Sequence, residues 1–248
     1  MILLLDVGNT SVYMGLSDGK ELVETYRMLT ESVKTPDEYY VTLKSILDVD
    51  LITDIALSSV VPRVTETLRR MCVKYLKKEP LIVGPGIKTG LKIKTDNPRE
   101  VGSDLICDAA AVADNKKPVL VIDLGTANKF IYIKDRAITG AIISTGIQVS
   151  RQALIGNTAL LPDVDVTVPA KVLGTNTVTC MQSGLTYGTA AMIDGLIERI
   201  QEEVKEEFDI ILTGGLSVII KDLCKTKLVR DQRLVLKGLL SIYLRNQA

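Results

Sequence analysis

Two short turns, each directly after an apolar strand, combine an aspartate with a glycine and a threonine. Asp6-Val-Gly-Asn-Thr10 follows the run Met1–Leu5, and Asp123-Leu-Gly-Thr-Ala127 follows Val119–Ile122. Glycine lets the backbone approach a ligand, N–H groups and threonine hydroxyls donate to anionic oxygens, and a nearby carboxylate can hold a cation. The pair predicts a site for a metal-bound nucleotide polyphosphate. Taken singly, each turn is equally consistent with a β-turn whose aspartate bonds its own backbone.

The spacing of the two turns indicates an internal repeat. Asp6 and Asp123 are separated by nearly half of the 248-residue chain. Similar segments at such a separation are typical of two related structural units. We therefore expect two related α/β lobes, residues 1–115 and 116–248, whose matching turns face one cleft.

An aspartate at an expected helix start is the candidate for proton transfer. Asp104 begins an alanine-rich segment expected to be helical from about Ser103 to Ala113, where the helix dipole favours a charged carboxylate. Such a group could take the proton of a substrate hydroxyl that attacks a γ-phosphate. The alternative is an acid that only stabilises the helix terminus. Asp108, one turn later, is expected to be a solvated acid.

A third glycine turn, Thr213-Gly214-Gly215, ends an apolar strand. Two glycines let a flat ring or a ribose lie against the backbone. A tight strand-to-helix connection is an equally good interpretation of this turn.

The composition favours a soluble globular protein with a small-molecule ligand. Hydrophobic residues make up 46% of the chain and charged residues 24%, and no apolar run reaches the roughly 18 residues of a membrane span. Lys and Arg together number 30, as do Asp and Glu, so we expect no basic field for nucleic acid or an anionic membrane.

The chain contains no histidine, which leaves a carboxylate as the expected proton acceptor. Its four cysteines have no CxxC spacing and are expected to be buried free thiols in a reducing cytoplasm, without zinc or disulfides. The sequence starts directly with a strand rather than a basic leader, so we expect a cytoplasmic protein.

Strand and helix signals alternate along the chain, as in α/β lobes. The expected strands are Ile2–Asp6, Val12–Leu16, Leu22–Met28, Asp54–Val61, and segments starting at 119, 130, 141 and 210. Besides the segment at Ser103, helices are expected from Pro36, after Pro62, and over 183–204 and 234–244. The stretch from Pro80 to Gly102 is expected to form loops around one short strand.

Six motifs resemble those of type III pantothenate kinases and occur in the same order nearly end to end. They are Asp6-Val-Gly-Asn-Thr10, Ser58-Ser-Val-Val-Pro62, Asn97-Pro98 with Glu100-Val-Gly102 and Asp104, Asp123-Leu-Gly-Thr-Ala127, Asn176-Thr177 with Met181-Gln-Ser-Gly184, and Thr213-Gly-Gly215. The resemblance implies the acetate and sugar kinase/Hsc70/actin superfamily, with two ribonuclease H-like lobes of the actin-like ATPase type, ATP in the cleft between them, and usually a homodimer. The implied reaction is transfer of the γ-phosphoryl of ATP to pantothenate, giving 4′-phosphopantothenate at the entry to coenzyme A synthesis.

The same resemblance implies roles for individual residues. Asp104 is the proton acceptor, Asp6 holds Mg²⁺, and Asp123 holds a monovalent cation such as K⁺ or NH₄⁺. The residues implied to bind ATP are Asp6, Val7, Gly8, Asn9, Thr10, Ser11, Val12, Tyr13, Thr126, Gly214 and Gly215. Those implied to bind pantothenate are Gly102, Ser103, Asp104, Leu105 and Thr177.

Several positions depart from the family pattern, and most of them lose a cationic or phosphate-facing group. Leu105 stands where Arg is usual, Thr175 where Lys is common, Asn128-Lys129 where Thr-Thr is usual, Thr145 where Pro is common and Asn157 where Arg is common. Losing one charge-assisted contact to the transferring group costs on the order of 3 kcal/mol, about a hundredfold in rate. Lys129 or Arg151 could compensate if either side chain pointed into the cleft.

Three hypotheses follow from the sequence. The first is an ATP-dependent pantothenate kinase, which retains Asp6, Asp104 and Asp123. The second is a non-catalytic homologue that binds nucleotide or pantothenate and acts through a partner. The third is a kinase for another small hydroxy acid or sugar.

Overall fold

Residues 2–29 fold as three consecutive antiparallel strands, β1 (Ile2–Val7), β2 (Ser11–Ser17) and β3 (Leu22–Leu29). The sheet is extended by β4 (Asp54–Ser59) and β5 (Leu81–Ile82), which run parallel to β1 in the order β3-β2-β1-β4-β5. The three predicted N-terminal strands are confirmed, and the fourth ends before Val60 and Val61. Side chains of β1 alternate between two buried faces, because successive residues of a strand point to opposite sides.

The computed structural model describes residues 1–247, which divide into two compact units. The first unit comprises residues 1–114, 136–138 and 233–247. The second unit comprises residues 115–135 and 139–232. Among residues 1–247, no helix is both long enough and apolar enough to span a membrane.

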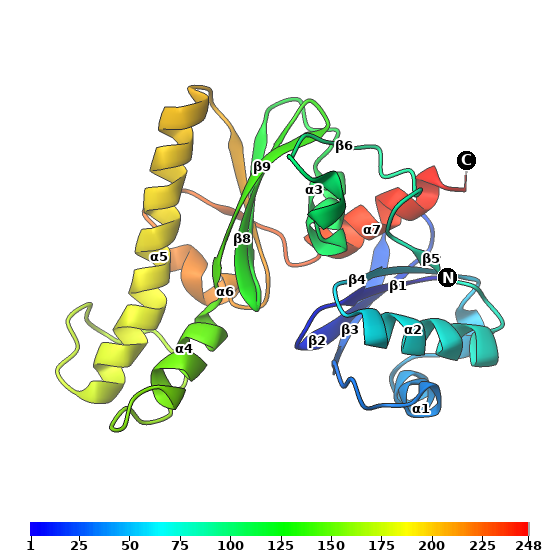
Figure 1. The fold of residues 1–248 in the computed structure, drawn as a ribbon, viewed down its shortest axis with the longest axis horizontal. Coiled ribbons are helices and arrows are strands. Elements are labelled where there is room, and N and C mark those ends of the chain that lie inside the picture. Colours follow the sequence, from blue (N-terminus) through cyan, green and yellow to red (C-terminus); the bar gives the residue numbers. More distant parts are fainter. Residues whose placement is uncertain (248) are drawn as a thin grey trace. The chain divides into compact units, whose positions relative to one another are not determined.

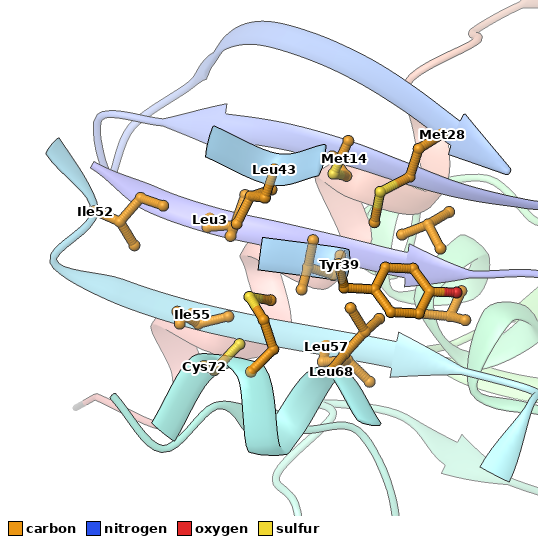
Figure 2. Packing of buried hydrophobic residues seen from close by; sticks show 14 of the residues in the cluster. Leu3, Met14, Met28, Tyr39, Leu43, Ile52, Ile55, Leu57, Leu68 and Cys72 are labelled. Atoms are coloured by element: carbon orange, nitrogen blue, oxygen red, sulfur yellow. The ribbon is translucent and has the colours of Figure 1, made fainter. Parts of the chain in front are cut away.

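Two helices, α1 (Pro36–Ile46) and α2 (Pro62–Met71), cover one face of the first sheet (Figure 1). Helix α1 begins with a capping box in which the Thr35 hydroxyl accepts the N–H of Glu38 while the Glu38 carboxylate accepts the N–H of Thr35, which satisfies two backbone donors at the helix start. Leu3, Leu43 and Leu68 belong to the buried cluster of this face, which Figure 2 shows in close-up.

The opposite face of the first sheet is covered by α3 (Ser103–Ala111) and α7 (Leu234–Arg245). Ile2 and Leu4 of β1 pack with Cys107 of α3 and with Leu239 of α7. The prediction had placed the segment of α7 in the second lobe, 116–248. In the structure α7 falls in the first compact unit, because its apolar side packs against α3 and β1.

The second unit is built on β7 (Val119–Leu124), β8 (Ala127–Lys134), β9 (Ala137–Thr145), β10 (Asp209–Thr213) and β11 (Val229–Arg230). The strand order is β11-β10-β7-β8-β9, and β6 (Lys92–Ile93) of the first unit pairs in parallel with residues 137 and 138. The stretch from Pro80 to Gly102 was expected to hold one short strand, but it contains both β5 and β6.

The helices of the second unit are α4 (Ile147–Gly156), α5 (Thr177–Val204) and α6 (Ser217–Ile220). Helix α5 starts six residues earlier than its prediction at Ser183 because Asn176 and Thr179 form a capping box. Leu120 and Ile122 of β7 pack with Ile193 of α5 in the core of this unit. Single turns of 3₁₀ helix lie at Val49–Leu51, Pro98–Glu100 and Lys221–Leu223, and a π-helical turn, Cys72–Leu76, continues α2.

The cysteines are free thiols, as expected, but not all are buried. Cys72 and Cys107 are buried, Cys224 is half-buried and Cys180 is exposed. Cys180 lies in the first turn of α5, where the capped helix end faces solvent.

The contact between α3 and α7 depends on a glycine. A Cβ atom at Gly238 would overlap the backbone carbonyl oxygen of Cys107. We expect Gly238→Ala to lower the free energy of unfolding by about 1–3 kcal/mol or more, since the rigid backbones of both helices must separate. Urea denaturation measures this loss.

Gly195→Ala in α5 is the matched control, because its Cβ would meet only the Arg199 side chain at 3.5 Å. This variant should keep or raise stability, by up to about 1 kcal/mol from helix propensity. Equal stability of the two variants would contradict close packing of α3 on α7.

Candidate active site

The turn after β1 presents its middle residues to solvent and keeps its ends in the core. Asn9 and Thr10 are exposed, Asp6, Gly8, Ser11 and Tyr13 are partly exposed, and Val7 and Val12 are buried. The Gly8 N–H donates to the Ser11 carbonyl at 3.0 Å, and the Thr30 hydroxyl donates to the Gly8 carbonyl at 2.7 Å. These bonds fix the loop while leaving the exposed groups of Asn9 and Thr10 at its tip.

A chain of hydroxyl groups links this turn to the start of α3. Ser58 Oγ lies 3.1 Å from Asp6 Oδ1 and 3.2 Å from Ser103 Oγ, so its proton can be donated to either. Ser103 Oγ accepts the Ser59 N–H at 2.9 Å and donates to the Ser59 carbonyl at 2.9 Å. Asp6 and Ser103, predicted separately, are thus brought together within the first unit.

Ser58 and Ser59 had no predicted role, although their motif was noticed. In the parallel register Asp6 stands opposite Ser58 and Val7 opposite Ser59. The signal was available, since both segments end an apolar strand and parallel neighbours finish at the same sheet edge. Sequence alone did not say that β4 is the neighbour of β1.

The carboxylate of Asp104 is held by the backbone at the start of α3. The Leu105 N–H donates to Asp104 Oδ1 at 2.8 Å, which uses one of the N–H groups that a helix start leaves without a partner. A Cβ at Gly102, the residue before the helix, would lie 2.6 Å from the same oxygen. The missing side chain of Gly102 therefore makes room for the carboxylate.

Leu105 occupies the core rather than an open position. Its side chain is 8% exposed, and its Cδ1 lies 3.6 Å from where a Cβ of Gly102 would stand, as does Cγ1 of Val60. Arg151, one of the suggested replacements for the missing arginine, pairs with Asp163, with 2.6 Å between Nη2 and Oδ1.

Helix α3 also buries two ionisable side chains, those of Cys107 and Asp108. Burial raises the pKa of the Cys107 thiol well above its ordinary value, and the negative charge of Asp6 acts in the same direction. Asp108 is only 1% exposed, so the prediction of a solvated acid was wrong. The reason is that residues 105–110 are all buried, which leaves this part of α3 without a solvent-facing side.

In the second unit, the turn after β7 carries an ion pair. Asp123 of β7 stands opposite Lys129 of β8 in the antiparallel ladder. Lys129 Nζ lies 2.6 Å from Asp123 Oδ2, and the two side chains are 12% and 16% exposed. On its other side Asp123 pairs in parallel with Thr213.

Thr126 and Gly214 lie around the same turn. The Gly146 N–H, at the start of α4, donates to the Thr126 carbonyl at 3.0 Å, so the N-terminus of α4 begins at this turn. Gly214 has φ +91, and a Cβ there would lie 2.5 Å from the Leu124 carbonyl oxygen. At the next residue, Gly215, no other atom lies within 4 Å of the place where a Cβ would stand.

Thr177 belongs to a different element, the first turn of α5. Its neighbour Asn176 caps the helix by accepting the Thr179 N–H at 3.0 Å. The first unit thus gathers the Asp6 turn with residues 102–105, and the second gathers Asp123, Thr126 and Gly214.

The donor set around Asp6 fits magnesium bound together with phosphate. Mg²⁺ keeps several waters and takes one or two protein carboxylates plus substrate phosphates. Among residues 1–247, no cluster of three or more His, Cys, Asp or Glu side chains is arranged as an all-protein metal cage. A single carboxylate next to an exposed Gly-Asn-Thr turn matches the first kind of site.

Comparisons of the sequence identify its relatives. A family model described as type III pantothenate kinase matches residues 2–199. The chain is 56% identical over 246 residues to a type III pantothenate kinase from Acholeplasma laidlawii, covering 99% of each chain. It is 42% identical over 255 residues to a type III pantothenate kinase from Brevibacillus brevis, covering 100% of both.

Solved structures share the fold at low sequence identity. A Campylobacter jejuni protein described as a Baf family transcriptional activator matches with a TM-score of 0.63 and 18% identity, covering 99% of this chain and 98% of that one. An inorganic polyphosphate/ATP-glucomannokinase from Arthrobacter matches with a TM-score of 0.51 and 15% identity, covering 100% and 99%. The predicted fold class, α/β with lobes of the actin-like ATPase type, is confirmed.

Proposed function

Because the chain belongs to the type III pantothenate kinase family, we propose that Asp6 and Asp104 of its first unit carry the reaction of that family. The protein is a kinase that transfers the γ-phosphoryl group of ATP to pantothenate, giving 4′-phosphopantothenate in coenzyme A biosynthesis. The observation that carries the residue assignment is the Asp6–Ser58–Ser103 chain, which ties the nucleotide turn to the helix of the proton acceptor.

The turn after β1 binds the phosphates of ATP. Its exposed residues are Asn9 and Thr10, whose side chains carry hydrogen-bond donors and no positive charge. Asp6 would hold Mg²⁺, which neutralises the charge that develops on the transferring phosphoryl group. Ser11 and Tyr13 border this turn, while the buried Val7 and Val12 support it from the core.

Asp104 accepts the proton of the pantothenate hydroxyl. With no histidine in the chain, a carboxylate is the suitable base, and the Leu105 N–H orients it through Oδ1. A carboxylate held in one orientation by a backbone N–H can accept a proton from a hydroxyl placed within hydrogen-bond reach. Gly102, Ser103 and Leu105, which flank Asp104 at the start of α3, form the proposed pantothenate contacts within the first unit, and the assignment of Thr177 to pantothenate rests on the family resemblance alone.

We assign nucleotide contacts to the turns of the second unit as well. Thr126 offers a hydroxyl beside the N-terminus of α4, where N–H groups attract anions. Gly214 packs against the Leu124 backbone and forms the turn, and Gly215 leaves the backbone open to the nucleoside. The resemblance assigns K⁺ or NH₄⁺ to Asp123, but the ammonium group of Lys129 already lies against that carboxylate.

The protein acts as a cytoplasmic homodimer. Free cysteines suit a reducing compartment. Large apolar side chains of the second unit are exposed, and such surface is typical of a subunit contact. They are Ile143, Leu154, Leu160, Val168, Val172, Leu173 and Val178.

Asp104→Asn removes the proton acceptor with almost no change in shape. We expect kcat for 4′-phosphopantothenate formation to fall about 10²- to 10⁴-fold, the usual contribution of a general base, with little change in Tm. Production of phosphopantothenate from Mg-ATP and pantothenate measures the rate. Asp50→Asn, at an exposed acid, is the control and should be fully active. An Asp104→Asn enzyme with undiminished kcat would end the assignment.

Gly102→Ala tests the positioning of the same carboxylate. The new Cβ would stand 2.6 Å from Asp104 Oδ1, so the carboxylate must move although the backbone need not. We expect the rate to fall roughly 10- to 100-fold, as for a displacement of about 1 Å, with the free energy of unfolding changed by less than about 1 kcal/mol. Gly84→Ala, with nothing within 4 Å of its Cβ, should behave as wild type. A fully active Gly102→Ala enzyme would contradict the proposed geometry.

Sedimentation equilibrium tests the dimer. We expect twice the 27.0 kDa chain mass, and the double variant Leu160→Glu/Leu173→Glu should shift the protein toward monomer because it places charge in an apolar contact. Val33→Glu, an exposed valine of the first unit, is the matched control. A wild-type protein that sediments only as monomer is incompatible with the proposal.

A further inference from the structure

We propose that Lys129 supplies a built-in cation at the Asp123 turn and makes this kinase independent of added K⁺ or NH₄⁺. The ammonium group would take the place of the monovalent cation that the resemblance assigns to Asp123. This inference rests on the proposed role of the Asp123 turn in nucleotide binding, and it concerns which positive charge serves that turn.

The backbone fixes the ion pair in place. Asp123 and Lys129 are directly opposite each other in the β7–β8 ladder, and opposite residues of an antiparallel pair project to the same face. Lys129 Nζ lies 2.6 Å from Asp123 Oδ2. Register and contacts together hold the ammonium group at this turn.

The Lys129–Asp123 pair is more buried than the surface ion pairs of the same protein. Its side chains are 12% and 16% exposed, whereas those of Lys74 and Asp37 are each 57% exposed. Exposed pairs are weak and screened by salt, while partly buried pairs are screened much less. Raising the ionic strength with a dissolved salt is therefore not enough to separate Lys129 from Asp123.

The carboxylate of Asp123 does not fit a second cation beside the lysine. Its negative charge is already balanced by the ammonium group 2.6 Å away. A K⁺ ion on the same carboxylate would be repelled by the ammonium group, and this repulsion lowers the affinity of the site for K⁺. The Asp123–Lys129 pair therefore does not fit a binding site for a dissolved monovalent cation.

The lysine head group has the chemistry that the site needs. It is an alkylated ammonium ion, carries a single positive charge and resembles NH₄⁺, which is one of the two implied cations. Because it is tethered, its effective concentration at Asp123 exceeds that of a dissolved salt at millimolar levels. The positive charge near the bound nucleotide is then present at every salt concentration.

The first experiment uses the wild-type enzyme. Protein freed of K⁺ and NH₄⁺ is assayed for phosphopantothenate formation while KCl replaces tetramethylammonium chloride at a constant ionic strength of about 100 mM, which keeps screening the same. We expect the rate to change less than about twofold, since no site is left to saturate. A saturable activation of about tenfold or more would overturn the proposal.

The second experiment removes the built-in cation. Lys129→Met should lower the rate in tetramethylammonium chloride by about 10- to 100-fold, and KCl or NH₄Cl should restore most of it. Lys134→Met, which removes a more exposed lysine of the same strand from its pair with Glu206, should respond to salt as wild type does. A Lys129→Met enzyme whose lost activity no monovalent cation restores would show that the lysine has another role.

A third readout does not depend on turnover. The Tm of each protein is followed with KCl against tetramethylammonium chloride, because a ligand that binds the native state stabilises it. Lys129→Met should gain a saturable K⁺-dependent rise in Tm that wild type lacks. The opposite pattern, with K⁺ stabilising wild type, would overturn the proposal even if the kinase assay itself failed. Absence of activity in every salt would instead count against the kinase function and leave the Tm result to decide the role of Lys129.

Discussion

The parallel pairing of β1 with β4 is the constraint on which the first half of the site depends. It places Asp6 opposite Ser58 at the edge where both strands end, and Ser58 in turn reaches Ser103 at the first residue of α3. Without that register, the Asp6 turn and the Asp104 helix would be two unrelated features separated by about a hundred residues of sequence. With it, hydrogen bonds through Ser58 join the group proposed to hold magnesium to Ser103, the residue before the proposed proton acceptor.

The second unit repeats this arrangement with one change. Asp6 has Tyr13 as its antiparallel neighbour and Ser58 as its parallel neighbour, while Asp123 has Lys129 and Thr213 in the corresponding positions. Each aspartate thus stands between a returning strand and a hydroxyl-bearing parallel strand. The difference lies in the returning strand, which brings an aromatic ring in one unit and an ammonium group in the other. In the proposals made above, the same backbone arrangement leaves one carboxylate for an added cation and gives the other a lysine of its own.

Local patterns were enough to predict the strands and the turns, because alternating apolar residues and glycine-containing turns are properties of short segments. The three N-terminal strands and the carboxylate turns follow from residues within a few positions of each other. What the sequence did not reveal depends on partners far along the chain. The burial of Asp108, the joining role of Ser58 and the packing of α7 on α3 are all of this kind. The Lys129–Asp123 pair lies between these cases, since the residues are close in sequence but the register of a short hairpin was needed to pair them.

The departure at Leu105 has a physical explanation once α3 is placed in its unit. A helix whose residues 105–110 are all buried has little room for a guanidinium group, and burying an unpaired charge is costly. Leu105 instead packs beside Gly102 and Val60 and contributes its backbone N–H to Asp104. The group that orients the proposed proton acceptor is therefore a backbone N–H, which is present whatever the side chain at 105. Because Leu105 carries no charge, neutralisation of the transferring phosphoryl group is left to the magnesium proposed at Asp6.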